Sequence, residues 1–168
     1  EWIFNSPLKL VNRQTANRLI FALDENQHCS LNSVHNTILK DDCIQKFKFD
    51  INSVQNNSCH SELEKTILHF LLGVLNSRLM NYYYRSVTQE TAKSFPQVHI
   101  ADLKELPIRM PDSGQMLRIA SRIDLIIKKD GDISRHLTEL DSLLFDLYGM
   151  NQRERDKIIR QTNPEWRI

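Results

Sequence analysis

Short runs of alternating apolar residues near the start of the chain predict β-strands. Residues 8–10 and 19–23 alternate apolar with other side chains, and polar residues separate the two runs. This spacing predicts a β-hairpin or meander, which residues 29–38 could extend as a third strand. Residues 40–51 show no decisive period, so the pattern leaves their structure open.

A helical pattern replaces the alternation from Ser61 onward. Ser61 and Glu64 have the spacing of a capping box, and apolar residues then recur every three or four positions as far as Leu75. The same pattern continues through Leu79 and Tyr83. We therefore expect one long helix that is buried on a broad face.

From residue 97 onward the pattern predicts a strand, a link and then helices. Residues 97–100 alternate as a short strand, and the prolines of residues 107–111 favour an extended link. Gly131, between two aspartates, predicts two helices, either folded back on each other or nearly collinear with a kink. Gly149 should end the second helix, and residues 152–160 should form a short charged one. The two helices carry an apolar seam with alternating steps of three and four residues: Met116, Ile119, Ile123, Ile126, Ile133, Leu137, Leu140, Leu144 and Leu147.

These elements together predict an α+β fold in two parts. Residues 1–112 should form a small twisted mixed β-sheet with a long packing helix. Residues 113–168 should form a helical spacer with a coiled-coil-like seam, followed by a C-terminal tail. The seam would pack on itself, on the rest of the polypeptide or on a second copy. A chain of 168 residues, 40% apolar and 26% charged, has enough material for one packed core.

The overall charge limits how the chain can meet an anionic partner. The 22 Lys and Arg residues against 21 Asp and Glu leave a net charge of +1, so a nucleic acid would have to be bound by a local arrangement of side chains. The longest apolar stretch, residues 67–75, is far shorter than the roughly 20 residues of a membrane span. The sequence opens at Glu1 without a leader pattern, so we expect a cytoplasmic protein and a piece of a longer polypeptide.

The sequence lacks the spacings that catalytic and metal-binding motifs require. Cys29, Cys43 and Cys59 contain no CxxC pair, which favours free thiols over a zinc site. The four glycines stand alone, so no glycine-rich loop is available for a phosphate or a methyl donor. Residues 163–166, NPEW, lack the second proline of an adenine methyltransferase motif, and no Asp/Glu-x-Lys cluster follows residues 111–112 as a nuclease would need. The chain itself is therefore expected to be non-catalytic.

Three stretches, taken in their order along the chain, resemble one protein family. Residues 71–84, LLGVLNSRLMNYYY, resemble the helix of target recognition domains in restriction-modification proteins. Residues 97–111, QVHIADLKELPIRMP, resemble that family's passage from its last strand into a spacer helix. Residues 139–150, ELDSLLFDLYGM, resemble the closing helix of the TaqI-like C-terminal specificity domain. Residues 112–114, DSG, depart from the Pro-Leu and acidic residue that related specificity subunits usually carry there.

The resemblance implies a sequence-specific reader of double-stranded DNA at the C-terminal end of a type II or IIG methyltransferase-endonuclease. In such proteins the globular part reads a short DNA sequence, and the helices hold it at a fixed distance from the methyltransferase or endonuclease domains of the same polypeptide. The parent is then expected to be an adenine-specific DNA methyltransferase, a restriction endonuclease or both. S-adenosylmethionine and Mg²⁺ would be bound in the rest of that parent, in a bacterial or archaeal cytoplasm, and this chain itself would need no cofactor.

Polar side chains that suit DNA contacts gather in three segments. Arginine can pair with guanine, and asparagine or glutamine with adenine, whereas basic loops with hydroxyl groups suit phosphates. A water-exposed turn would have a similar composition, so these residues are hypotheses. Tyr82, Tyr83 and Tyr84 could stack on bases, although two of them are expected in the core. The candidates are Lys9, Arg13, Gln14, Asn17 and Arg18 around the first turn, His35 on the third strand, and Arg85, Thr88, Gln89, Lys93, Gln97 and His99 after the long helix.

Two alternatives belong to other functional classes. The first is a protein-interaction or oligomerisation module, whose heptad helices pair with another helix or form a dimer while the globular part only supports them. It predicts a stable oligomer and no response to DNA. The second is a small stand-alone enzyme or metal protein.

Overall fold

A three-stranded sheet forms one side of the molecule in the computed structural model, which describes residue 3 and residues 5–45, 60–88 and 96–162. The strands are β1 (Lys9–Arg13), β2 (Phe21–Asp24) and β3 (Val34–Thr37). Their order is β2-β1-β3, and both pairings are antiparallel, which differs from the mixed sheet expected from the sequence. The third strand is shorter than the predicted residues 29–38, and residues 41–45 after it are helical.

The long helix predicted from Ser61 is two helices, α2 (His60–Asn76) and α3 (Arg78–Val87). Ser77 separates them because its side chain caps the second helix: Oγ accepts a hydrogen bond from the backbone N–H of Met80 at 3.0 Å. The same hydroxyl donates to the carbonyl oxygen of Val74 at 2.7 Å. The prediction of one continuous helix is therefore wrong, although both halves are helical as expected.

The segment predicted as a strand at 97–100 contributes one isolated bridge, between Thr15 and Gln97. Ile100 already begins the short helix α4 (Ile100–Lys104). An extended link follows, as the prolines at 107 and 111 predict. The bridge nevertheless attaches this part of the chain to the first turn of the sheet.

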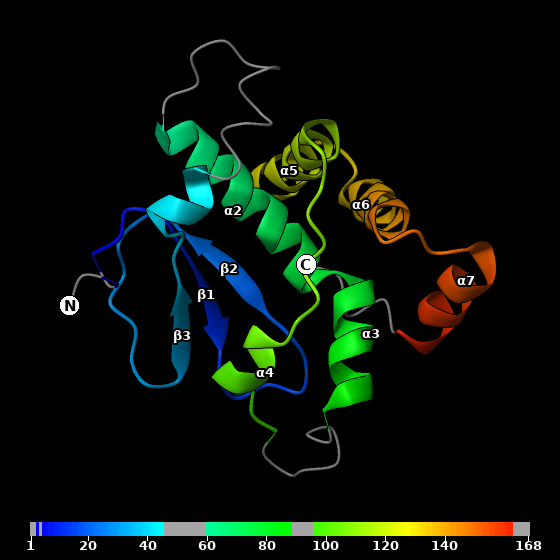
Figure 1. The fold of residues 1–168 in the computed structure, drawn as a ribbon, viewed down its shortest axis with the longest axis horizontal. Helices are drawn as coiled ribbons and strands as arrows, with labels where there is room; N and C mark the ends of the chain where they lie inside the picture. Colours follow the sequence, from blue (N-terminus) through cyan, green and yellow to red (C-terminus); the bar gives the residue numbers. More distant parts are fainter. Residues whose placement is uncertain (1–2, 4, 46–59, 89–95, 163–168) are drawn as a thin grey trace.

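The last third forms three helices, α5 (Ser113–Lys128), α6 (Ile133–Leu147) and α7 (Gln152–Gln161). The seam breaks at Gly131, which has a φ of +74° that a glycine adopts without strain. Helices α5 and α6 pack against each other as a folded-back hairpin, the first of the two arrangements left open by the sequence (Figure 1). Gly149, with a φ of +67°, follows the second helix as expected.

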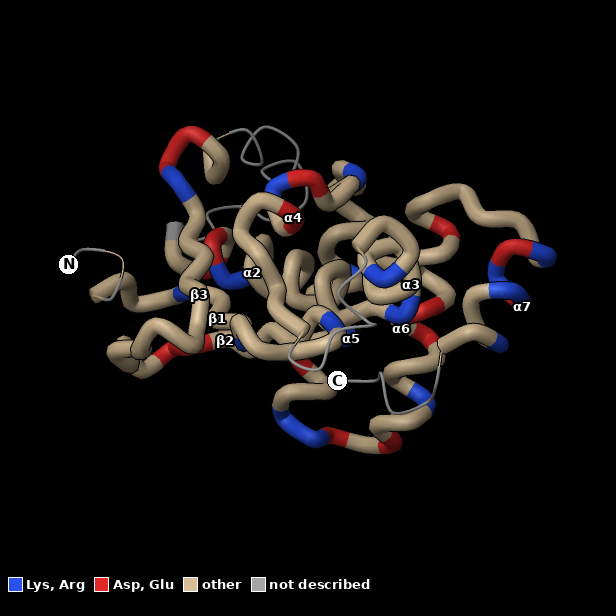
Figure 2. The backbone as a smooth tube through the Cα atoms, turned by 90° about the horizontal axis from the view of Figure 1, so that it is seen from below, with Lys and Arg blue, Asp and Glu red and all other residues tan. Residues whose placement is uncertain are grey.

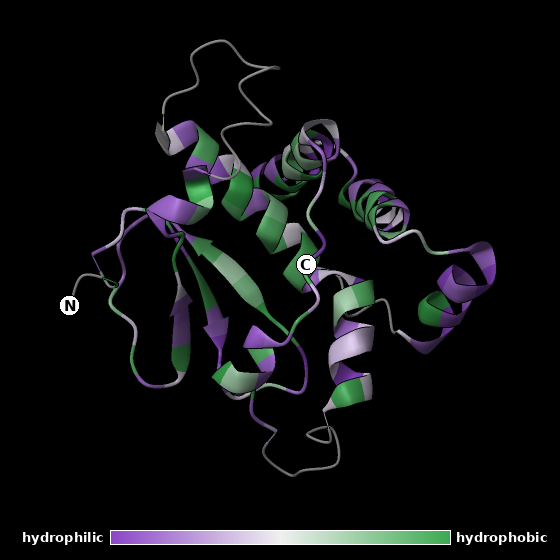
Figure 3. Cartoon of the chain, viewed as in Figure 1, coloured by the Kyte–Doolittle hydropathy of each residue, from purple (hydrophilic) through white to green (hydrophobic). Residues whose placement is uncertain are grey.

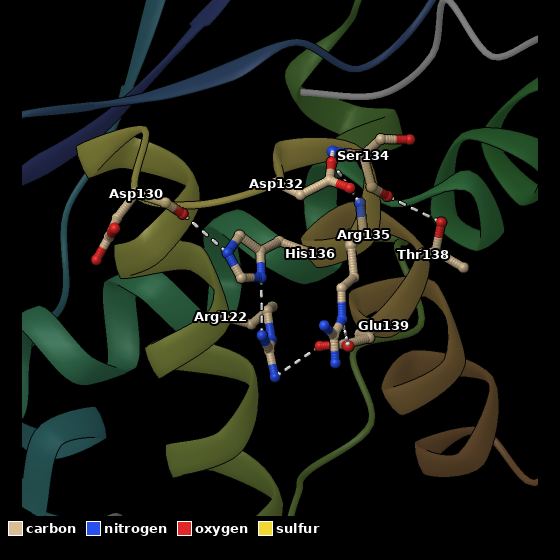
Figure 4. Close-up of polar contacts among 8 residues, drawn as sticks. All are labelled: Arg122, Asp130, Asp132, Ser134, Arg135, His136, Thr138 and Glu139. Atoms are coloured by element: carbon tan, nitrogen blue, oxygen red, sulfur yellow. Dashed lines mark hydrogen bonds and ion pairs between the residues drawn. The ribbon is translucent and has the colours of Figure 1, made fainter.

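A polar network holds the turn of this hairpin (Figure 4). Arg122 on α5 approaches both Nδ1 of His136, at 2.8 Å, and a carboxylate oxygen of Glu139, at 2.7 Å. Because arginine only donates, Nδ1 of His136 is the acceptor, and Nε2 then donates to the carbonyl oxygen of Asp130 at 2.9 Å. These contacts fix the ends of α5 and α6 relative to each other.

The helical hairpin is packed on the rest of the molecule and does not extend away from it. Helix α5 lies along α2, and Gly73 sits where they approach closely, since a Cβ added there would be 3.1 Å from Cγ1 of Ile123. One hydrophobic core therefore continues across residue 112, where the chain passes from the sheet and its helices to the helical hairpin. The buried seam residues belong to the same hydrophobic cluster as Leu10, Ile67 and Phe70: Met116, Ile119, Ile123, Ile126, Leu137, Leu140, Leu144 and Leu147.

His69 lies in the contact between α2 and α5. Its side chain is only 5% exposed, and its Nε2 atom has no hydrogen-bond partner in the part of the chain that the structure describes. Burial lowers the pKa of His69, and the nearby positive charge of Lys65 lowers it further, against smaller opposite effects of Asp124 and Glu25. The imidazole is therefore held neutral in the folded chain.

We expect acidification to destabilise the fold through His69. The ordinary pKa of histidine in an unfolded chain is about 6.5. Below that value the unfolded chain binds a proton that the folded chain resists, so stability is lost as the pH falls through this range, by at most about 1.4 kcal/mol per pH unit for this one group. The measurement is the free energy of unfolding in urea at several pH values from 7.5 to 5, in wild type and in His69→Gln. The variant should show the smaller decline, and equal declines would contradict the prediction.

Candidate nucleic-acid interface

Segments that are distant in the sequence meet at one end of the sheet. The backbone N–H of Val98 donates to the carbonyl oxygen of Gln14 at 2.7 Å, and that of Ala16 donates to Pro96 at 3.1 Å. These bonds join the β1–β2 turn to the chain entering α4. We call this region the turn end, defined by residues 13–18, 33–36, 85–88 and 97–99, and it lies at the lower side of Figure 1.

The start of β3 is attached to the same place. Nε2 of His35 donates to the carbonyl oxygen of Val98 at 3.0 Å, and the N–H of Gln14 donates to the carbonyl oxygen of Ser33 at 2.9 Å. His35 therefore uses one ring nitrogen for structure. The other nitrogen is the one it can offer to a ligand.

The end of α3 completes this region. Tyr84 is 1% exposed and donates its hydroxyl to the carbonyl oxygen of Gln97 at 3.4 Å, so its ring packs in the core and cannot stack on a base. Tyr83 also packs against the core. Thr88 ends the helix by donating its hydroxyl to the carbonyl oxygen of Tyr84 at 2.8 Å. The three sets of candidates that the sequence suggested separately are therefore brought together.

The exposure of the candidates differs from one to another. Arg13, Asn17, Arg85, Gln97 and His99 are exposed, whereas Gln14, Arg18, His35 and Thr88 are half-buried. Gln89 and Lys93 lie outside the described residues. The segments of the turn end contain three arginines and two histidines and no acidic residue; Glu90 follows the third segment by two positions in the sequence, and Asp102 follows the last one on α4. This composition suits an anionic partner.

Lys9 does not belong to this set. Its side chain is fully buried, and its ammonium group is 2.8 Å from a carboxylate oxygen of Asp24, the residue opposite it on β2. A buried and paired ammonium group is not presented at the surface, so the structure corrects the expectation that Lys9 contacts DNA. Its role is inside the fold.

Two exposed apolar side chains lie at the turn end and were not among the predicted residues. Val87 at the end of α3 is 57% exposed, and Ile100 at the start of α4 is 53% exposed. Apolar side chains can contact the methyl group of thymine in the major groove. The sequence signal for Val87 is an apolar residue between two hydroxyl side chains, Ser86 and Thr88.

Two asparagines from the α2–α3 junction position β2, which is an edge strand. The side-chain amide of Asn76 accepts from the N–H of Phe21 at 2.8 Å and donates to the carbonyl oxygen of the same residue at 2.9 Å. Oδ1 of Asn81 accepts from the N–H of Leu19 at 2.8 Å. Both side chains are buried, so the chain returning from the first turn is fixed by the helices behind it.

A tyrosine on the hairpin fixes the link that follows α4. The hydroxyl of Tyr148 donates to the carbonyl oxygen of Pro107 at 2.8 Å and accepts from the N–H of Arg109 at 3.2 Å. Burial raises the pKa of Tyr148, so the hydroxyl keeps its proton for the first of these bonds. The guanidinium of Arg78 on α3 lies 2.9 Å from a carboxylate oxygen of Asp141, and this ion pair joins α3 to α6. The three stretches that carry the family resemblance thus build the frame of the turn end.

Residues 48–108, about a third of the chain, match the family model of the TaqI-like C-terminal specificity domain. This match confirms the resemblance and covers α2, α3 and α4. No curated protein matches the chain. The described part of the chain contains no group of three metal-ligating side chains, and none of its helices has the length and hydropathy to cross a membrane.

Proposed function

We propose, from the match to the specificity domain, that this chain reads a short sequence of double-stranded DNA for a restriction-modification enzyme. The observation that supports this function best is the turn end, which brings together the exposed residues Arg13, Asn17 and Arg85 on segments that contain no acidic residue. Hydrogen bonds between the segments hold this surface in place. Base recognition requires such support, because loosely held side chains discriminate poorly between bases.

The side chains of the turn end suit two kinds of DNA contact, to base edges and to phosphates. Arg13 suits a bidentate contact to guanine in the major groove, and Gln14 and Asn17 suit adenine. Arg85 and Thr88, at the end of α3, suit phosphate oxygens, which position the protein without reading the sequence. Val87 and Ile100 would then lie where a thymine methyl group can be contacted.

The whole enzyme is part of the same proposal. The parent would be a type II or IIG adenine methyltransferase, an endonuclease or both, in the cytoplasm, and its catalytic domains would precede this chain. S-adenosylmethionine would supply the methyl group and Mg²⁺ would serve cleavage, both outside the residues described above. The frame around Tyr148 and α6 would orient the turn end toward those domains.

We expect substitutions at the β1–β2 turn to weaken specific binding and to relax the preference at individual base pairs. A preferred duplex is first selected from a random library with the wild-type chain. Arg13→Gln and Asn17→Ala should each weaken binding to that duplex by roughly 5- to 150-fold, the value of one good base contact, and renewed selection should show a relaxed position. Fluorescence anisotropy of labelled duplexes measures the affinities.

Matched substitutions away from the turn end provide the controls. Asn26, at the opposite end of β2, and Arg118, on α5, are both exposed, so Asn26→Ala and Arg118→Gln should leave the selected sequence unchanged. Failure of the wild-type chain to enrich any sequence would overturn the proposed function, and so would equal effects of the control and turn substitutions.

The oligomerisation alternative receives less support, because the seam it requires is already occupied. The seam residues of α5 and α6 other than Ile133 are buried within the chain, against α2 and against each other. A partner helix would have to use the outer side of the hairpin. This side holds a shallow hollow with apolar residues Leu117, Leu125 and Leu143.

A further inference from the structure

Helix α7 has one face that is fixed to the body of the protein. Arg155 donates from Nε to the carbonyl oxygen of Met150 at 2.8 Å and from Nη2 to Asp146 at 2.6 Å, with its guanidinium carbon 5.8 Å from the centre of the Phe145 ring. Ile158, on the same side, is 2% exposed. The hydrophobic part of α7 lies toward α3 in Figure 3. This face anchors the helix.

The opposite face of α7 carries a row of three basic side chains. Arg153, Lys157 and Arg160 are four and three residues apart, so at 100° per residue they fall within a narrow stripe. All three are exposed, and none has an ion pair or hydrogen bond to any residue that the structure describes. We call these residues the basic row.

The carboxylates of α7 do not neutralise the basic row by direct pairing. Glu154 accepts the backbone N–H of Asn151 at 2.9 Å in a capping box, and Asp156 accepts the side-chain amide of Gln152 at 2.9 Å. Both therefore have other partners, and helical geometry places them beside the stripe and not in it. The basic row keeps its charge available to a ligand.

Helix α7 carries the basic row on its outer side, turned away from α3. Helix α7 packs on α3, and α3 ends in the turn end at Arg85 to Thr88. Figure 2 views the molecule from the side of the turn end, with the sheet on one side of α3 and the Lys and Arg positions of α7 on the other. To reach the basic row, a duplex bound at the turn end has to continue past α3 to the outer side of α7.

We propose that the basic row binds the sugar-phosphate backbone of the DNA that flanks the recognised sequence, an inference that rests on the proposed function. Residues 153 and 160 are seven positions apart, about 10 Å along the helix at about 1.5 Å each, close to three nucleotide steps of about 3.4 Å each, a stretch that holds four successive phosphates of one strand. Three long basic side chains without a structural partner therefore suit such a stretch in charge and in length. The contacts carry no sequence information and add affinity to every duplex.

The test compares two variants that lose the same charge. One replaces the basic row, as Arg153→Gln, Lys157→Gln and Arg160→Gln together. The other replaces three exposed basic residues at α5 and the hairpin turn, as Arg118→Gln, Lys128→Gln and Lys129→Gln together. Fluorescence anisotropy measures binding of the selected duplex and of an unrelated duplex. If the basic row makes three phosphate contacts, then between about 50 and about 200 mM salt the wild-type affinity should fall about 40-fold more than that of the basic-row variant.

The outcomes separate this inference from the proposed function. Weaker binding of both duplexes by the basic-row variant, with an unchanged preference between them and a wild-type response in the α5 variant, would support the inference. Equal salt dependence of the two variants would overturn it, even if the wild type still prefers one sequence. Loss of all sequence preference in the wild type would instead overturn the proposed function. Unchanged urea midpoints would show that the variants are folded, as expected for exposed side chains of which only Lys128 has an ion pair, with Asp124 on the helix surface.

Discussion

Lys9→Met should lower the free energy of unfolding by about 3–5 kcal/mol, because it leaves the carboxylate of Asp24 buried without its cation. Lys9 and Asp24 are opposite each other on β1 and β2, 0% and 6% exposed. Asp24 keeps hydrogen bonds from the N–H groups of Asn26 and His28, both at 2.9 Å, but these do not replace a full positive charge. Urea unfolding followed by circular dichroism measures the loss.

A second ion pair provides a matched control for this loss. Lys65 and Glu25 are 2.6 Å apart but 41% and 45% exposed, so Lys65→Met should cost less than about 1 kcal/mol. The double variant Lys9→Met/Asp24→Leu should recover much of the stability, because it removes the unpaired charge. Equal losses of unfolding free energy in Lys9→Met and Lys65→Met would contradict the prediction, because the buried pair would then contribute no more stability than the exposed one.

The pH dependence of Asp24 gives an independent readout of the same pair. Burial acts to raise the pKa of Asp24, but hydrogen bonds from Lys9, Asn26 and His28 outweigh it and hold the pKa well below its usual range. In the wild type this carboxylate therefore contributes stability that is present above about pH 4, the ordinary value, and is lost as the pH falls below it. The difference in unfolding free energy between wild type and Lys9→Met should shrink over the same range, because a protonated Asp24 no longer needs its cation.

Asn76→Ala should cost about 2–4 kcal/mol, the second largest effect that we expect. The substitution leaves the backbone N–H and carbonyl oxygen of Phe21 without partners in a buried edge strand, and each unpaired group costs about 1–3 kcal/mol. The N–H of Phe21 should then exchange with solvent deuterium much faster. Urea unfolding and hydrogen exchange measure the two effects.

An exposed asparagine separates this effect from the loss of any amide side chain. Asn17→Ala, in the β1–β2 turn, should change the unfolding free energy by less than about 0.5 kcal/mol. If Asn76→Ala is as mild as Asn17→Ala, the junction between α2 and α3 does not hold β2. Because β2 leads back from the turn end, Asn76→Ala should also disturb the recognition surface while Asn26→Ala does not.

The sequence predicted the elements whose signals are local and missed those that depend on distant partners. The seam from Met116 to Leu147 and the glycine at 131 predicted both helices of the hairpin, because period and break lie within one segment. Ser77 carried no such signal, since a serine within a helix can donate to a carbonyl three or four residues back as well as cap a new helix. Residues 97–100 alternate like a strand, yet pairing there is limited to one bridge, at Gln97, because the chain turns into α4.

The candidate site shows the same limit at the level of single residues. Lys9 resembled the other basic residues near the turn, and only the pairing register of β1 and β2 places it opposite Asp24 in the interior. The grouping of Arg13 with His99 was equally hidden, because the backbone bonds that join their segments connect residues more than 60 positions apart in the chain. Composition identified suitable side chains, and the fold selected among them.

Helix α2 is shared between the sheet on one side and α5 on the other, so neither can shift without the other. The loops of the turn end are attached to this rigid frame, and they contribute little to its packing. They can therefore change by mutation while the frame, and the direction in which it points, stays the same. Under the proposed function, this separation of loops from frame lets related enzymes acquire new DNA target sequences by mutation of the loops. The contacts between the frame and the catalytic domains would not have to change.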